Sequence, residues 1–105
     1  MDFSEKKINI VFIESALIDL VPILIETLSK ELADMEILLR SGKLADLQDL
    51  NHSSRGAALT YGFDDYAEIL IVVKKAVQCG DREGARSLLG QLRNMLGTVE
   101  FRSLE

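Results

Sequence analysis

Apolar residues recur at helical spacing over most of the chain. Between residues 21 and 40 they fall every three or four positions, as expected for one face of an amphipathic helix. These positions are Val21, Leu24, Leu28, Leu32, Met35 and Leu39. Pro22 suits the first turn of such a helix, where its missing N–H costs nothing, and Gly42 suits a left-handed cap. The pattern predicts a helix over 21–40; a longer helix kinked at Pro22 is the alternative.

A second amphipathic segment runs from about Leu44 to Thr60 and stops at Gly62. At about 100° per residue, its apolar and small residues gather on one side. That side consists of Leu47, Leu50, Ser54, Ala57, Ala58 and Tyr61. The segment therefore predicts a second helix that packs one face against the rest of the chain.

Two more segments complete the pattern. Residues 65–68, Asp-Tyr-Ala-Glu, have the form of a capping box, and the helix they predict runs towards Gly80. Its apolar positions are Ile69, Leu70, Val72, Val73, Ala76 and Val77. Asp81 can cap the last helix. The apolar side of this helix includes Ala85, Leu88, Leu89, Leu92 and Leu96.

The segment before these helices is different in kind. Residues 8–13 are β-branched and favour extended structure, but they are too isolated to predict a sheet. We expect an extended or frayed lead-in against the helices, followed by a short helix at about 15–20 that lies across one end as a lid. Four long amphipathic segments with short turns predict an all-α fold, an up-down-up-down four-helix bundle. We expect one domain over 1–105, with its core at about 16–96.

Composition limits the possible partners and compartments. The net charge of −5 disfavours nucleic acid and anionic membranes as partners. No run approaches the roughly 20 apolar residues that cross a bilayer, and Asn9 and Glu14 interrupt the apolar stretch that a secretory signal would need. We expect a monomeric cytoplasmic protein. Cys79 is the only cysteine, so it forms no intramolecular disulfide or cysteine-based metal cluster, and we expect it to pack as a small hydrophobe near a helix end.

The candidate chemistry lies on the second helix. His52 is the only histidine, and its position falls almost opposite the centre of the apolar side. Arg55 follows at i+3 and Gly56 at i+4, where residues on a helix surface are neighbours. A solvent-facing imidazole beside a guanidinium and bare backbone is poorly suited to a core. It is well suited to contact with another protein.

This arrangement resembles the histidine-containing phosphotransfer (HPt) domains of bacterial two-component phosphorelays. The family pattern is matched by His52, Arg55, Gly56, Ala57, Ala58 and Gly62. The segments 61–63, Tyr-Gly-Phe, and 19–22, Asp-Leu-Val-Pro, are similar to one branch of the family, and the resemblance covers about 16–96. The family commonly has Lys at position 55, so Arg55 keeps the charge and changes its shape.

The resemblance implies a phosphorelay intermediate rather than an enzyme. His52 would accept a phosphoryl group from an aspartate of a receiver domain, or from a hybrid histidine kinase, and pass it to an aspartate of a response regulator. Mg²⁺ would belong to the partner receiver, so we expect no cofactor and no metal site in this chain. The planar guanidinium group of Arg55 can donate two hydrogen bonds to phosphate oxygens. Gly56 costs roughly 1 kcal/mol relative to Ala in a helix, which access for a partner would explain.

Small, polar and apolar residues flank His52 along the same strip of helix. We expect partner binding at Ala45, Gln48, Asp49 and Leu59. Two other functions stay open. One is an HPt-like adaptor or inhibitor that docks on a kinase or receiver without carrying phosphate. The other is a phosphatase acting on a receiver, which would need a side chain to direct water; Gln48, one turn before His52, is the nearby candidate.

Overall fold

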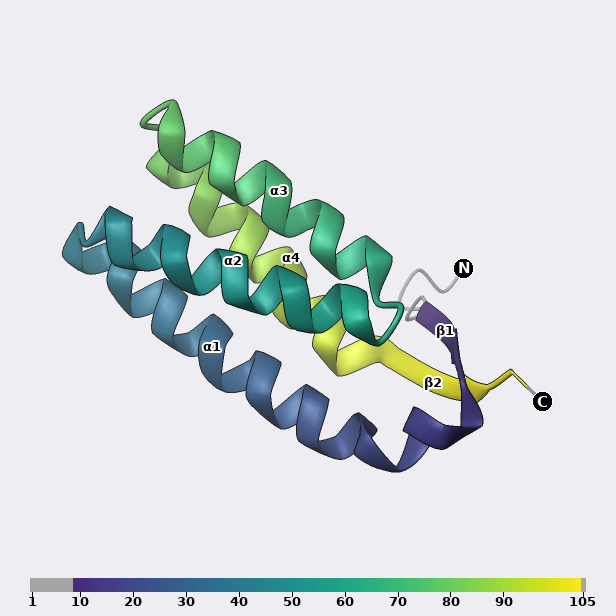
Figure 1. Cartoon of the computed structure of the whole chain (residues 1–105). Coiled ribbons are helices and arrows are strands. Elements are labelled where there is room, and N and C mark those ends of the chain that lie inside the picture. Colours follow the sequence, from purple (N-terminus) through teal and green to yellow (C-terminus); the bar gives the residue numbers. More distant parts are fainter. Residues whose placement is uncertain (1–8, 105) are drawn as a thin grey trace, which may run out of the picture.

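A computed structural model describes residues 9–104 of the chain. In order, its elements are β1 (Asn9–Ile13), the 3₁₀ helix η1 (Ser15–Leu20), α1 (Val21–Ser41), α2 (Leu44–Thr60), α3 (Asp64–Gln78), α4 (Arg82–Thr98) and β2 (Val99–Ser103). The four α-helices alternate in direction, and each packs on the next, with α4 returning to α1 (Figure 1). The predicted all-α, up-down-up-down bundle is confirmed.

The helix ends follow local chemistry. Pro22 lies in the first turn of α1, and a separate 3₁₀ helix precedes it, so there is no single kinked helix. Gly42 ends α1 at φ 73°, a left-handed conformation that favours glycine. The Asp81 carboxylate accepts a hydrogen bond from the Gly84 N–H at 2.9 Å and caps α4 as predicted.

The prediction that residues 8–13 form no sheet is wrong for the described residues. β1 pairs in parallel with β2, with Asn9 opposite Val99 and Ile13 opposite Ser103. The two strands lie at the end of the bundle where α2 turns into α3 (Figure 1). Phe101 of β2 meets the buried Phe63 edge-on, with ring centroids 5.5 Å apart. The short segment is stable as a strand because its partner arrives from the other end of the chain.

Three local predictions are also corrected. α3 begins at Asp64, after Phe63, and Asp65 makes no capping hydrogen bond; burial of Phe63 sets the start of the helix, and both acids lie in its first turn, where the helix dipole favours them. Val72 is exposed because the buried face of α3 passes through Leu70 and Val73, on the other side of the helix. Cys79 is exposed as well, since it follows the last buried turn of α3.

Within residues 9–104, no helix combines the length and the apolar character that crossing a bilayer requires.

Candidate functional site

α2 is held on both sides by buried polar side chains. The Ser54 hydroxyl donates to a carboxylate oxygen of Glu31 in α1 at 2.8 Å, and the Asn51 amide donates to the Leu70 carbonyl in α3 at 2.8 Å. Both Ser54 and Asn51 are almost fully buried. The burial of Asn51 was not predicted, although it lies four residues after Leu47 on the same face. These contacts fix the rotation of α2 and turn the opposite face outward.

His52 lies on that outer face and is exposed, as predicted. The Arg55 guanidinium Nη2 is 3.2 Å from His52 Nδ1. A guanidinium can only donate, so Nδ1 is the acceptor, and a neutral ring then carries its proton on Nε2. The spacing of His52 and Arg55 on one helix therefore produces a direct contact in the folded chain.

The space beside His52 is open at Gly56. A Cβ atom built at Gly56 would meet no heavy atom within 4 Å outside its own helix backbone and chain neighbours. Nothing in the packing of the bundle therefore requires glycine at this position. That Gly56 leaves room for an approaching molecule stays a prediction.

The flanking positions do not form one uniform strip. Ala45 and Asp49 are exposed, and Leu59 keeps 53% of its surface accessible. Gln48 differs: it is half-buried, and its Nε2 donates to the carbonyl oxygen of Lys74 in α3 at 3.2 Å. Its Oε1 is enclosed without a hydrogen-bond partner among residues 9–104. The expectation of an exposed Gln48 is therefore corrected, because this side chain lies in the seam between α2 and α3.

Leu59 has apolar neighbours that the sequence pattern did not indicate. It borders a shallow hollow of about 240 Å³ with Phe12 of β1 and Leu17 of η1. Phe12 is itself 58% exposed. Pairing of β1 with β2 brings Phe12 to this end of α2, so its position depends on a contact between distant parts of the chain. The apolar period of the local sequence therefore does not predict the position of Phe12.

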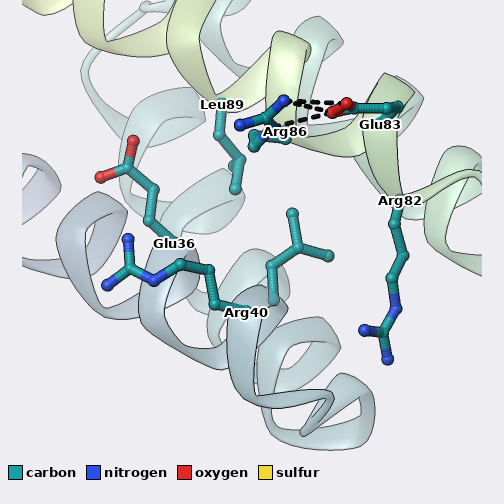
Figure 2. A pocket seen from close by; sticks show the side chains of 7 residues that line it. Glu36, Arg40, Arg82, Glu83, Arg86 and Leu89 are labelled. Atoms are coloured by element: carbon teal, nitrogen blue, oxygen red, sulfur yellow. Dashed lines mark hydrogen bonds and ion pairs between the residues drawn. The ribbon is translucent and has the colours of Figure 1, made fainter.

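The hollow of Figure 2 lies elsewhere, between α1 and α4. It has a volume of about 360 Å³, and Glu36, Arg40, Arg82, Glu83 and Arg86 are among its lining residues. Arg86 pairs with Glu83 inside it, and Glu36 pairs with Arg93 of α4. None of its lining residues belongs to α2. Within residues 9–104 there is no group of three or more His, Cys, Asp or Glu side chains arranged to hold a metal ion.

Comparison with known proteins agrees with this geometry. The model of the Hpt domain family matches residues 19–101, which include η1 in part, the whole bundle and the start of β2. Neither the curated proteins nor the solved structures yielded a match. Because the family match spans most of the sequence and contains His52, Arg55 and Gly56, the chain belongs to the Hpt domain family, whose members carry phosphoryl groups on histidine in phosphorelays.

Proposed function

We propose that His52 accepts a phosphoryl group from an aspartyl phosphate of a receiver domain, or from a hybrid kinase, and passes it to an aspartate of a response regulator. The observation that carries the proposal is the exposed imidazole of His52 in contact with Arg55, with open space at Gly56. Phosphoryl transfer depends mainly on in-line positioning and neutralisation of charge. An exposed nucleophile on a rigid helix is suited to the first requirement and a nearby guanidinium to the second.

The transfer step makes one bond and breaks one. A ring nitrogen of His52 attacks the phosphorus, and the P–O bond to the aspartyl oxygen breaks, so that the carboxylate leaves with the electron pair. The proton on the other ring nitrogen stays on the ring. The reverse displacement, by an acceptor carboxylate, regenerates the neutral imidazole.

Arg55 has to leave the ring during this step. Attack by Nδ1 needs the lone pair of Nδ1, which in the structure accepts a hydrogen bond from the Arg55 guanidinium at 3.2 Å. Attack by Nε2 needs the ring proton on Nδ1, and a guanidinium cannot accept a hydrogen bond from that N–H. In both cases the guanidinium is freed, and the new phosphoryl oxygens one turn away are its natural acceptors. Arg55 thus holds the ring at rest and the phosphoryl group after transfer.

The experiment is incubation with a panel of phosphorylated receiver domains. Label should appear on the domain, disappear in acid and persist in alkali, as a phosphoramidate does, and His52→Gln should abolish it without lowering the melting temperature. Arg55→Ala should slow transfer, and Arg55→Lys should restore much of it. Label on His52→Gln would exclude the assignment, and unchanged transfer by Arg55→Ala would remove Arg55 from the site.

Two alternatives predict other outcomes of the same experiment. A docking adaptor would bind receivers and take no label. A receiver phosphatase would release phosphate without labelling His52, and Gln48 would have to direct the attacking water. The Gln48 amide donates instead to Lys74 and its oxygen is enclosed, an arrangement that disfavours this role.

A further inference from the structure

The seam between α2 and α3 places the backbone of Lys74 beside Gln48, one helical turn before His52. Gln48 donates to the Lys74 carbonyl at 3.2 Å, and Asn51 donates to the Leu70 carbonyl at 2.8 Å. These two bonds align one turn of α3, from Leu70 to Lys74, with the turn of α2 that ends at His52. Gln48 precedes His52 by four residues, about 6 Å along the helix axis.

Lys74 is free to act at this place. Its side chain is exposed, and it forms no ion pair among residues 9–104. Neighbouring helices pack about 8–10 Å apart, and a lysine amine on its flexible four-carbon stem can span much of that distance. The ammonium group can therefore reach a phosphoryl group on His52 from the α3 side.

The charges around His52 favour a second cation. Arg55 of α2 contacts the imidazole, and its positive charge would attract a phosphoryl group on the ring. Asp49, exposed at i−3 from His52, would repel that group. A phosphoryl group on nitrogen would carry negative charge close to the carboxylate of Asp49, and a single guanidinium leaves part of that charge uncompensated.

We infer that Lys74 is a second phosphate-binding residue, which contacts the phosphoryl oxygens on His52 from α3 while Arg55 contacts them from α2. The inference rests on the proposed function of His52. Gln48 is then a positioning residue, because its hydrogen bond to the Lys74 carbonyl holds this turn of α3 beside the histidine.

The test compares Lys74→Met, which removes the charge and keeps most of the stem, with Lys74→Arg and with Lys75→Met. Lys75 is the adjacent exposed lysine of the same helix and serves as the matched control. Transfer from a phosphorylated receiver to Lys74→Met should slow by roughly three- to tenfold, an effect that added salt should reduce. Lys74→Arg should keep most of the rate, and Lys75→Met should transfer like the unmodified protein.

A second measurement needs no receiver. Because the chain has one histidine, chemical phosphorylation with phosphoramidate should place phosphohistidine at His52 alone, and ³¹P NMR can follow the titration of its phosphoryl group. Loss of the ammonium group should raise the pKa of that phosphoryl group in Lys74→Met and leave it unchanged in Lys75→Met. A Lys74→Met titration identical to the control would overturn the inference, even if transfer slowed, since Lys74 would then act on the receiver. Absence of label on the unmodified domain would instead refute the proposed function.

Discussion

Asn51→Asp tests whether the buried amide holds α2 against α3. The substitution keeps the size of the side chain, so it leaves no cavity, but it replaces the donor of the 2.8 Å bond to the Leu70 carbonyl with a carboxylate. Asn51 is only 1% exposed. At neutral pH the lost bond and the buried, unpaired charge should together lower the free energy of unfolding by about 3 kcal/mol or more. That is a large fraction of the roughly 5–15 kcal/mol typical of a domain.

The stability lost in Asn51→Asp should depend on pH. Burial beside a carbonyl oxygen disfavours the charged form, so the pKa of the introduced carboxyl should be raised in the folded state above its ordinary value of about 3.9. Near pH 4 the protonated carboxyl can donate to Leu70 and the variant should approach the unmodified protein. As pH rises from there to the raised folded pKa, stability should fall by about 1.4 kcal/mol per pH unit.

Urea unfolding followed by circular dichroism between pH 4 and 8 measures this difference. The unmodified protein run over the same pH range accounts for its other titrating groups, and Asn94→Asp supplies the matched control, because Asn94 is exposed on α4. Equal stability of Asn51→Asp and Asn94→Asp at pH 7 would refute the structural role of the Asn51 amide. A loss independent of pH would show that packing, and not the charge, is responsible.

Substitutions at three further positions separate the stability of the bundle from the chemistry on its surface. Burial, with a smaller contribution from Glu31, raises the pKa of the Tyr66 phenol, so stability should decline above about pH 10 as the unfolded chain ionises. The Tyr66 hydroxyl has no hydrogen-bond partner among residues 9–104; Tyr66→Phe should remove that decline and cost little at pH 7, which urea unfolding of both proteins from pH 8 to 11 would check. Leu59→Glu should weaken receiver binding tenfold or more, measured by titration calorimetry, while the melting temperature falls little because half of Leu59 is exposed; a large fall would place Leu59 in the core. Gly56→Ala should stabilise the helix by up to about 1 kcal/mol, whereas Gly56→Leu should slow transfer without melting the domain, and normal transfer by Gly56→Leu would exclude an access role.

The helices could be predicted because their causes are local. The apolar period that includes Leu28, Leu32 and Met35 specifies one buried face, and Gly42 and Asp81 mark helix ends through their own backbone and side-chain chemistry. All three apolar residues are fully buried in the structure. The exposed position of His52 followed from the same periodicity, since a residue opposite the buried side must face solvent.

The remaining features depend on which parts of the chain meet. β1 is a strand because Val99–Ser103 lies beside it, and nothing within residues 9–13 reveals that partner. The place of Gln48 in the seam and the arrival of Lys74 depend on the register between α2 and α3, which an apolar period does not encode. A shift in register would keep both helices amphipathic and yet move Lys74 and the other side chains of α3 relative to His52.

The buried polar side chains are the groups that can fix this register. Apolar contacts tolerate small axial shifts at modest cost, whereas the bond from Asn51 to Leu70 and the bond from Ser54 to Glu31 are each satisfied at one alignment only. Both donors lie within two residues of His52 on the inner side of the same helix. The inner face of α2 therefore determines which side chains of the neighbouring helices lie beside the histidine on its outer face. Substitutions of Arg55, Gly56 or Lys74, around His52 on the surface, should change transfer without changing the fold, and substitutions of Asn51 or Ser54 should change both.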